Sequence, residues 1–484
     1  MNGRGLKWEE IIMLMPKIYP VTCHTDHVGP GSTFVAIKGY ATDGTKYIND
    51  ALAKGATTIV LDQASSTPEL EDLCKQFQAG YSVVRDTRIA LAEQAAQALG
   101  NPADKLKIIG ITGTKGKTTT AYLTEYLLRQ AGHKTALVST IAQTIGDQRE
   151  DSKLTTPESD YLQMFFAQCV KAGVEYVVME VSSHALALNR VHGIEFTSVG
   201  FSNLSQDHLD FHGDLESYFA AKTQLFSMVK AGGSIVINSD SEWGKRAAEC
   251  AAAHSKGASI ISYGQEPMSA NHEHLQILET SFSGITIKLG SQTYFCPSLF
   301  GSFNGYNIAM AILLCSDAKI NAAQALAQFP GVPGRLQKHT LKSGAHAFVD
   351  YAHNTPSFHA VLSMLRPYTK HLIVIFGCGG NKPKERRFGM GRVAAEFADT
   401  IIVTDDNPRF EDRNAIINDI ISGMPEEKQK AVVRQADRAQ AIALAASLAH
   451  EGSIVALLGK GHETYYLING QTLYFDDYEE IRKF

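Results

Sequence analysis

The sequence predicts an α/β fold in which a central parallel sheet, built around a phosphate-binding loop, is flanked by helices. Apolar runs of strand length alternate with helix-period segments along most of the chain, which favours parallel strands joined by helices. One apolar strand, Lys107–Ile111, runs into a glycine-rich turn and then into a helix that begins near Thr118. Polar residues follow several other predicted strands, at the edge where open parallel sheets bind their ligands.

The turn after Lys107–Ile111 has the composition of a phosphate-binding loop. Gly113 and Gly116 allow backbone N–H groups to point at phosphate oxygens, and Lys117 supplies a cation. Thr118 offers a hydroxyl to Mg²⁺. Ile111 stands where the strict pattern has glycine, so the match is to the shorter Gly-Thr-x-Gly-Lys-Thr form. The loop predicts binding of ATP or GTP.

Composition argues against several other classes of protein. The 484 residues carry a formal net charge of −5 with both signs mixed along the chain, so we expect neither nucleic acid nor an anionic membrane surface as a partner. Seven scattered cysteines, none in a Cys-x-x-Cys pair, favour a reduced compartment. The N-terminus lacks the apolar core of a signal peptide, and no run of about eighteen apolar residues occurs. We therefore expect a cytoplasmic protein without membrane insertion.

Length and linker composition divide the chain into three expected domains, at residues 1–99, 100–333 and 334–484. In the central block, the stretch Leu275–Phe300 alternates in the manner of antiparallel strands appended to the sheet. The other expected strands are Thr33–Ile37, Thr57–Leu61 and Tyr81–Val84 in the first block, Ala136–Ser139, Tyr176–Glu180, Val199–Ser202 and Ser234–Asn238 in the second, and Ala347–Val349, Leu372–Phe376, Thr400–Thr404 and Ile454–Leu458 in the third.

Two polar clusters follow strands of the central block. Glu180 ends the run Tyr-Val-Val-Met-Glu, where a carboxylate beside hydroxyl groups suits a magnesium ligand. The alternative is a glutamate that caps a helix or faces water. Asp207, His208, Asp210 and His212 follow the next strand, and this density of metal-binding and proton-carrying groups predicts a functional cluster. For any single histidine among them, a structural hydrogen bond is the default role.

Ten short motifs occur in order along the chain: Thr112–Thr119, Thr155–Pro157, Met179–Ala185, Asn203–Asp210, Tyr218–Lys222, Gly331–Arg335, Asp350–His353, Gly377–Gly380, Asp405–Arg409 and Gly459–Glu463. This series resembles the Mur ligase family and, within it, the enzymes that add the third residue of the peptidoglycan stem peptide. The phosphate loop and the His353 motif are shared with folylpolyglutamate synthetases and indicate only the superfamily. The remaining motifs, in this order, are specific.

The resemblance implies a three-domain architecture: a small N-terminal α/β domain that binds the UDP substrate, a central ATP-binding domain with a phosphate-loop parallel sheet, and a Rossmann-like C-terminal domain that binds an amino acid. It implies a ligase that uses ATP and Mg²⁺ to convert a substrate carboxylate into an acyl phosphate, from which an amine displaces phosphate. The implied partners are small-molecule substrates, the UDP-muramoyl dipeptide and a diamino acid, and the chain is expected to act as a monomer.

The resemblance also implies site residues. The catalytic set is Lys117, Glu180, His208 and Lys222, with Lys222 carbamylated and with Thr118, Glu180 and His208 as magnesium ligands. Without the resemblance, Lys222 would be interpreted as an ordinary exposed lysine on a helix that starts near Leu215. The implied ATP contacts are Gly113, Thr114, Lys115, Gly116, Lys117, Thr118, Thr119, Asn304, Arg335, Asp350 and His353.

Arg335, Asp350 and His353 reach ATP in this hypothesis only when the C-terminal domain closes, which excludes water from a hydrolysable acyl phosphate. For Arg335 the alternative is a salt bridge that links domains. The implied contacts to the muramoyl dipeptide are Thr25, Thr155, Thr156, Ser183 and Arg190. Where the family usually has Asp-Ser-Arg, this chain has His24-Thr-Asp26, so Thr25 keeps the hydroxyl but the arginine is absent.

The implied contacts to the amine donor are Lys382, Asp406, Asn407, Arg409, Gly459 and Glu463. Arg409 favours meso-diaminopimelate, because a guanidinium can bind its distal carboxylate through two hydrogen bonds. L-lysine has no such carboxylate and would leave Arg409 unpaired. Against this, diaminopimelate-adding members usually have Gly-Gly-Asp-Arg where this chain has Gly379-Gly-Asn-Lys382. Lysine keeps the positive charge but lacks the guanidinium geometry that binds a carboxylate through two hydrogen bonds. L-lysine therefore stays open as the alternative donor.

Two other classes of protein are weighed against this hypothesis. A folylpolyglutamate-type ligase should lack the Asp-Asn-Pro-Arg and Gly-Lys-Gly-His-Glu motifs, which this chain has. A nucleotide-binding homologue without ligase activity would be expected to lose Lys117, Glu180, His208 or Lys222. All four are present.

Overall fold

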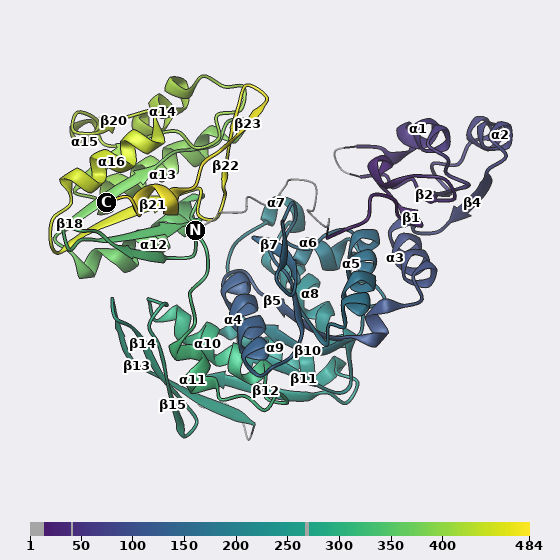
Figure 1. Cartoon of the computed structure of the whole chain (residues 1–484), viewed down its shortest axis with the longest axis horizontal. Coiled ribbons are helices and arrows are strands. Elements are labelled where there is room, and N and C mark those ends of the chain that lie inside the picture. Colours follow the sequence, from purple (N-terminus) through teal and green to yellow (C-terminus); the bar gives the residue numbers. More distant parts are fainter. Residues whose placement is uncertain (1–13, 40–41, 267–270) are drawn as a thin grey trace, which may run out of the picture. The chain divides into compact units, whose positions relative to one another are not determined.

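The structure is a computed structural model that describes residues 14–39, 42–266 and 271–484 (Figure 1). These residues form two compact units. The first comprises the chain up to residue 278 together with 286–294 and 303–327, and the second comprises 279–285, 295–302 and 328–484. The finer division into three domains, with boundaries near residues 99 and 333, stays a prediction.

The N-terminal part of the first unit is a four-stranded parallel sheet in the order β1-β2-β3-β4. Thr22 Oγ1 and the backbone N–H of Cys23 donate hydrogen bonds to the buried Asp160 carboxylate, at 2.7 and 3.1 Å. These bonds join the first strand to helix α5 of the central sheet. The elements are β1 (Val21–Thr22), η2 (Thr25–His27), β2 (Thr33–Val35), η3 (Gly44–Tyr47), α1 (Ile48–Ala53), β3 (Thr58–Asp62), α2 (Pro68–Gln76), β4 (Gly80–Val84) and α3 (Thr87–Ala98).

The central sheet has eleven strands in the order β15-β14-β13-β12-β11-β10-β5-β9-β6-β7-β8 (Figure 1). From β13 to β6 the neighbouring strands pair in parallel, whereas β7 and β8 extend one edge in antiparallel fashion. The strands are β5 (Lys107–Thr112), β6 (Thr135–Val138), β7 (Ala142–Ile145), β8 (Gln148–Asp151), β9 (Tyr176–Glu180), β10 (Phe196–Phe201), β11 (Val229–Asn238), β12 (Ser259–Gly264), β13 (His272–Ser281), β14 (Gly284–Leu289) and β15 (Gln292–Cys296).

The predicted strands of the central block are present, and β13 to β15 lie at one edge of its sheet as the alternating stretch Leu275–Phe300 indicated. Strands β7, β8 and β12, in contrast, were not predicted. Strand β8 gives the clearest reason. Its residues, Gln-Arg-Glu-Asp, are all exposed and carry no apolar signal. The accompanying helices are η4 (Pro102–Lys105), α4 (Lys117–Gln130), α5 (Ser159–Ala172), α6 (Ser183–Ala187), α7 (Leu209–His212), α8 (Leu215–Thr223), η5 (Gln224–Met228), α9 (Glu242–His254), α10 (Phe303–Leu314) and α11 (Ala322–Ala327).

The three strands at the centre, β9, β5 and β10, are almost entirely buried, as continuous apolar runs in parallel sheets require. Gly110 lies within β5 because a side chain there would meet its neighbour: an added Cβ would lie 2.7 Å from the Phe196 ring of β10. This close packing fixes the strand whose carboxyl end begins the glycine-rich turn.

The second unit contains a six-stranded sheet in the order β16-β17-β21-β18-β19-β20, antiparallel only between β16 and β17, and a separate hairpin of β22 and β23. The strands expected from residue 347 onward are confirmed. The elements are β16 (Gln337–Thr340), β17 (His346–Asp350), α12 (Thr355–Leu365), η6 (Arg366–Tyr368), β18 (His371–Phe376), α13 (Lys384–Phe397), β19 (Thr400–Val403), α14 (Arg413–Ser422), α15 (Glu426–Gln429), β20 (Val433–Arg434), α16 (Arg438–Leu448), β21 (Ser453–Leu458), β22 (Tyr465–Ile468), β23 (Gln471–Tyr474) and α17 (Asp477–Ile481).

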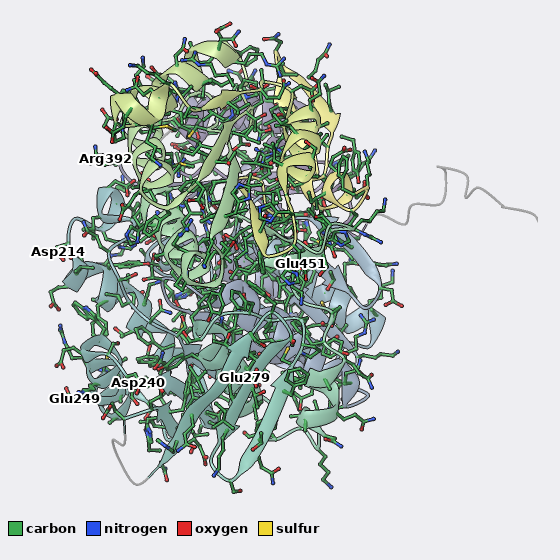
Figure 2. The ribbon with its side chains drawn as sticks, turned by 90° about the vertical axis from the view of Figure 1, so that its left-hand side faces the viewer. Asp214, Asp240, Glu249, Glu279, Arg392 and Glu451 are labelled. Atoms are coloured by element: carbon green, nitrogen blue, oxygen red, sulfur yellow. The ribbon has the colours of Figure 1, made fainter. Side chains whose placement is uncertain are left out.

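Charged side chains of both signs lie on the surface, among them Glu249 of α9 and Arg392 of α13 (Figure 2). Among the described residues, no helix combines the length and apolar character that crossing a membrane would need.

A fully buried ion pair stabilises the carboxyl ends of the strands in the second unit. The Arg438 guanidinium donates to both oxygens of Asp477, at 2.7 and 2.6 Å. It also donates to the backbone carbonyl of Asp405, two residues after β19, at 3.0 Å, and to that of Leu458, the last residue of β21, at 3.1 Å. The cation thus fixes the segment after β19 and the end of β21 at once, and both lead into motifs predicted to bind the amine donor.

We predict that Arg438→Met lowers the free energy of unfolding of the second unit by about 3–5 kcal/mol, because the Asp477 carboxylate is left buried without its partner. Hydrogen exchange of the β19 and β21 amides measures this loss. The matched control is Arg434→Met, since Arg434 is exposed and its loss should change stability by less than about 0.5 kcal/mol. Equal effects of the two substitutions would contradict the role given to the buried pair.

Candidate functional site

The glycine-rich turn between β5 and α4 has the backbone geometry of a phosphate-binding loop. Gly113 and Gly116 adopt φ values of 141° and 86°, which residues with a Cβ rarely adopt. A Cβ at Gly113 would lie 1.9 Å from Ser202 Oγ, and one at Gly116 would lie 2.4 Å from Asn307 Oδ1. Helix α4 begins at Lys117, one residue before the predicted start. Its N-terminal end, rich in N–H donors, therefore faces the turn.

The segment after β10 holds this turn in place. Asn203 accepts from the backbone N–H of Lys115 at 2.9 Å and donates from its amide to the Lys115 carbonyl at 3.1 Å. Thr114 Oγ1 accepts from the N–H of Ser205 at 3.0 Å. The Lys115 ammonium lies 3.1 Å from the Asp207 carboxylate. Burial is the largest single effect on Asp207 and raises its pKa, but Lys115 and His208 together outweigh it, so the pKa of Asp207 is lowered.

Two lysine ammonium groups meet at one carbonyl of the turn. Lys117 Nζ donates to the carbonyl of Gly113 at 2.8 Å and to that of Thr114 at 3.0 Å. Lys222 Nζ, from α8, donates to the same Gly113 carbonyl at 2.9 Å and lies 4.5 Å from the centre of the Tyr218 ring. Two lysine side chains therefore converge where the loop would receive a phosphate.

Lys222 is buried, so the interpretation of an ordinary exposed lysine is wrong, although the predicted helix at Leu215 is present. Burial and the neighbouring Lys117 cation hold the pKa of Lys222 well below its usual range, while Asp207 opposes this shift. The neutral amine is thereby favoured. A neutral amine is the form that can react with carbon dioxide to give a carbamate.

Glu180 ends β9 and is fully buried, so the alternative of a glutamate that faces water is wrong. The backbone N–H and the hydroxyl of Thr140 donate to its two carboxylate oxygens, at 2.8 and 3.1 Å. Thr140 Oγ1 also lies 3.0 Å from Thr155 Oγ1. One threonine, not recognised in the sequence, thus links a predicted magnesium ligand to a predicted substrate contact.

Three histidines cluster beside α6 and α7. The ring of His184 lies 4.9 Å from that of His208 and 5.6 Å from that of His212. Burial, followed by these two neighbours, lowers the pKa of His184 to about 4. Burial also lowers the pKa of His208; Asp207 opposes this shift, and Lys117 and Lys222 add to it. The imidazole of His208 is therefore kept neutral, with a lone pair available, and it lies within the electrostatic reach of both lysines.

The predicted contacts to the muramoyl dipeptide lie around Glu180. Thr156 Oγ1 donates to the Glu180 carbonyl at 2.9 Å, and Arg190 donates to the Thr156 carbonyl at 2.9 Å. Arg190 also forms a 2.7 Å ion pair with Glu158, so its charge is balanced within the chain. Ser183 Oγ lies 3.0 Å from His212 Nε2. The first unit thus brings together Thr155, Thr156, Ser183 and Arg190.

Two further residues of the first unit lie on separate elements. Asn304 of α10 is buried and accepts from the amide of Asn307, whose Oδ1 also borders Gly116. Asn304 is thus one residue removed from the phosphate loop. Thr25 begins the short helix η2 of the N-terminal sheet, where its carbonyl accepts from Lys54 at 3.2 Å. No contact that the structure describes joins Thr25 to the loop.

Within the second unit, three predicted ATP contacts surround the turn between β17 and α12. Asp350 accepts from the backbone N–H groups of Leu336 and Ala352, both at 2.8 Å. Burial raises the pKa of Asp350, and the Arg335 cation opposes this effect. The Arg335 guanidinium lies 5.0 Å from the centre of the Tyr351 ring. Burial lowers the pKa of His353 to about 4, so its imidazole is neutral. That these residues reach ATP on closure stays a prediction.

The predicted donor contacts gather where β19 and β21 end. Asn407 donates to Glu463 at 2.8 Å and accepts from the backbone N–H of Leu467 at 2.9 Å. A Cβ at Gly459, whose φ is 109°, would lie 3.3 Å from Asp406 Oδ2. Glycine therefore leaves space beside that carboxylate. Burial, followed by the Asp406 charge, raises the pKa of Glu463.

Arg409 lies at the same site, in a left-handed conformation with φ of 58°. Its backbone N–H donates to Leu467 of the β22 hairpin at 2.8 Å, and its guanidinium donates to the carbonyl of Gly380 at 3.3 Å. Lys382 is exposed, and burial of part of its side chain together with the Arg409 and Arg386 cations lowers its pKa. Lys382 and Arg409 therefore form a cationic edge beside Glu463.

The donor set expected for Mg²⁺ fits the residues present. A buried carboxylate at Glu180, a neutral imidazole at His208 and the hydroxyl of Thr118 combine oxygen ligands with one nitrogen, and Mg²⁺ usually takes few protein ligands with water and phosphate completing its shell. In the part of the chain that the structure describes, no three His, Cys, Asp or Glu side chains converge as a metal site by themselves.

The chain is similar to known proteins along most of its length. Family models match three segments: the Mur ligase family catalytic domain at residues 17–99, the Mur ligase middle domain at 111–315 and the Mur ligase glutamate ligase domain at 334–461. A relative from Clostridium botulinum, a UDP-N-acetylmuramoyl-L-alanyl-D-glutamate–2,6-diaminopimelate ligase, is 38% identical over 465 residues, covering 94% of this chain and 92% of the relative. The chain belongs to the Mur ligase family. It is a ligase of a family that uses ATP, and the predicted α/β fold class is confirmed.

Other members of the family extend this result. A diaminopimelate ligase from Aquifex aeolicus is 36% identical and covers 98% of this chain and 95% of its own length. A solved Mur ligase structure with the same substrate name is 30% identical, with a TM-score of 0.66, and covers 96% of this chain and 94% of its own. The Thermotoga maritima MurF ligase in complex with ADP is 17% identical with a TM-score of 0.59 over 93% and 95% of the two chains, and it supports the fold alone.

We predict that Lys222→Ala leaves nucleotide binding nearly unchanged and lowers turnover by about 100-fold or more, because a charged group beside the transferring phosphate is lost while the loop backbone remains. Calorimetric titration with ATP and the rate of phosphate release measure the two effects. Lys245→Ala, at an exposed position on α9, is the control. Near-normal turnover of Lys222→Ala would refute the catalytic role of this lysine.

Proposed function

We propose that the chain is an ATP-dependent ligase that joins meso-diaminopimelate to the D-glutamyl carboxylate of UDP-N-acetylmuramoyl-L-alanyl-D-glutamate, in peptidoglycan synthesis. The observation that carries this proposal is the meeting of Lys117 and Lys222 at the Gly113 carbonyl, beside Glu180 and the predicted dipeptide contacts. The full-length similarity to diaminopimelate ligases supports the choice of substrates. In the cell this activity belongs to the cytoplasm, where the nucleotide substrates are made.

The reaction begins at a carboxylate, which is a poor electrophile until it is activated. A carboxylate oxygen attacks the γ-phosphorus of ATP and ADP leaves, which gives an acyl phosphate. The donor amine then attacks the acyl carbon, a tetrahedral intermediate forms, phosphate departs with its electron pair, and the nitrogen loses a proton to complete the amide. Positive charge and N–H donors at the phosphate loop stabilise the charge on the transferring group.

The residues of the first unit divide this work. The backbone from Gly113 to Thr119 would hold the triphosphate, and Lys117 would neutralise charge on its γ-phosphate. Thr118, Glu180 and His208 would hold Mg²⁺, which would supply further neutralisation of charge when bound. Asn304 lies where it could contact the adenine. Thr155, Thr156, Ser183 and Arg190 would orient the muramoyl dipeptide, and Thr25 would contact its nucleotide end.

Lys222 has two possible forms in this proposal, and its surroundings favour conversion of one into the other. Its neutral amine nitrogen, favoured by burial, can attack carbon dioxide, and the carbamic acid that results loses a proton to become an anion. A carbamate would turn a cation into an anion beside the loop, and would so balance an added metal charge. The depression of the amine pKa therefore supports carbamylation.

The amine donor would bind in the second unit. Asp406, Asn407, Gly459 and Glu463 would contact its ammonium and carboxylate groups, while Arg409 and Lys382 would bind the distal carboxylate. Arg335, Asp350 and His353 would reach the nucleotide when the second unit closes, which would exclude water from the acyl phosphate. L-lysine, which lacks a distal carboxylate, is the second candidate, because Lys382 lacks the fork of the arginine usual at that position.

We predict that the protein releases phosphate from ATP only when both the muramoyl dipeptide and an amine are present, and that diaminopimelate is used in preference to L-lysine when the two compete. Mass analysis of the product identifies the amine incorporated. In Arg409→Ala the KM for diaminopimelate should rise roughly 10- to 150-fold, because charged hydrogen bonds are lost, while the KM for ATP changes little.

Arg392→Ala is the control for the second part, since Arg392 is exposed on α13 and lies outside the donor set. Phosphate release without a muramoyl substrate would contradict the proposed reaction. Preferential incorporation of L-lysine would contradict the proposed donor, and an equal rise of both KM values in Arg409→Ala would contradict the clamp.

A further inference from the structure

Lys460 is a fully buried lysine at the donor site to which the proposed reaction gives no task. It follows β21, between Gly459 and Gly461. Its ammonium donates to the carbonyl of Tyr465 at 2.5 Å, and lies 4.9 Å from the centre of the Tyr466 ring and 5.5 Å from that of Tyr465. A lysine is rarely buried completely unless its charge is compensated.

Two carboxylates provide that compensation. Glu463 Oε2 lies 3.6 Å from the Lys460 ammonium, and Asp406 Oδ1 lies 3.9 Å from it. These distances suit ion pairs, but one of the two carboxylates has an oxygen that accepts no hydrogen bond from the described residues. Asp406 Oδ1 is buried and has no hydrogen-bond partner within the ranges that the structure describes.

The charges of this cluster do not balance by themselves. Asp406 and Glu463 carry two negative charges and Lys460 carries one positive charge, so the three side chains have a formal charge of −1 in a buried setting. Burial and the Asp406 charge raise the pKa of Glu463, while Lys460 and the hydrogen bond from Asn407 oppose this shift. The Arg438 cation also interacts with Asp406, but it is already paired with Asp477. Arg409 and Lys382 lie on the edge toward Gly379 and Gly380, where the distal carboxylate of the donor is assigned.

We propose that Lys460 is a positioning residue of the donor site: it holds the Asp406 and Glu463 carboxylates side by side and leaves them one positive charge short, which the ammonium group of the amine substrate supplies. Gly459 makes room for that group, since even a Cβ there would lie 3.3 Å from Asp406 Oδ2. Asn407 fixes the second carboxylate by its 2.8 Å hydrogen bond to Glu463. This inference rests on the proposed function, because it assigns the ammonium to the same donor.

An uncharged side chain of similar length would satisfy the packing at this position but would not satisfy the charge. Methionine could fill the space between Tyr465 and Tyr466, and the backbone between two glycines would be unchanged. Without a shared cation the two carboxylates would repel each other. They would then move apart, or one of them would take up a proton. Both changes weaken binding of an ammonium group, and neither touches the phosphate loop.

The test is Lys460→Met in the full chain, with steady-state kinetics for diaminopimelate and for ATP. The KM for diaminopimelate should rise roughly 10- to 100-fold, as expected when a charged contact is displaced, while the KM for ATP changes less than about twofold. The control is Lys384→Met, which removes an exposed lysine of α13 whose side chain is 65% accessible. Unchanged KM values in Lys460→Met, or equal rises in both, would overturn the inference.

A measurement of stability decides the same question independently of activity. If Lys460 balances the two carboxylates, Glu463→Gln should recover much of the thermal stability that Lys460→Met loses, so that the two substitutions are strongly non-additive. Additive losses would overturn the inference. Where Lys460→Met alone fails to fold, failure of the double variant to fold as well would overturn it. Absence of diaminopimelate-dependent phosphate release by the unmodified protein would refute the proposed function instead, and the stability coupling would still decide the role of Lys460.

Discussion

The backbone carbonyl of Gly113 accepts hydrogen bonds from two lysine side chains, and much of the first unit is arranged to make this possible. Lys117 reaches it from the start of α4, and Lys222 reaches it from α8, more than one hundred residues later in the chain. Lys222 is buried and Lys117 is half-buried, and both lie against a turn that itself requires two glycines at positive φ. Two cations here would repel each other, and this repulsion, after burial, is a cause of the lowered pKa of Lys222. An anionic ligand, or conversion of Lys222 into an anionic carbamate, would stabilise the arrangement. The loop therefore favours a bound negative charge, which its own residues do not supply.

The second unit has the opposite imbalance of charge, an excess of carboxylates over their cation. Its buried Asp406 and half-buried Glu463 share one lysine, and Arg438 holds the end of β21 and the segment after β19 that lead to these side chains. A site that lacks negative charge and a site that lacks positive charge suit the two substrates of an amide ligase, a nucleotide triphosphate and an amine. In the proposed function, each unit would therefore favour the reactant whose charge is complementary to its own.

Sequence alone predicted the strands that carry the site, because central parallel strands are continuous apolar runs and polar residues follow their carboxyl ends. It also predicted the phosphate loop, since glycine, lysine and threonine at that spacing have a local mechanism. It could not predict that Lys222 is buried, because its exposure depends on how α8 packs against a turn far away in the chain. Lys460 lies between two glycines and has the local appearance of an exposed turn, but in the folded unit it packs against Tyr465, Tyr466 and Asp406. Thr140 was missed for a related reason, since a single threonine after a strand carries no signal until Glu180 lies beside it.

The account as a whole depends on phosphorylation of a carboxylate at the loop before any amine reacts. The most direct test is to supply muramoyl dipeptide with ¹⁸O in its glutamyl carboxylate and to measure the mass of the phosphate released during turnover with diaminopimelate. The account predicts that one ¹⁸O atom from the carboxylate appears in each phosphate, because that oxygen bridges carbon and phosphorus in the acyl phosphate. Release of phosphate without ¹⁸O would show that ATP cleavage does not pass through the carboxylate, and would contradict the account.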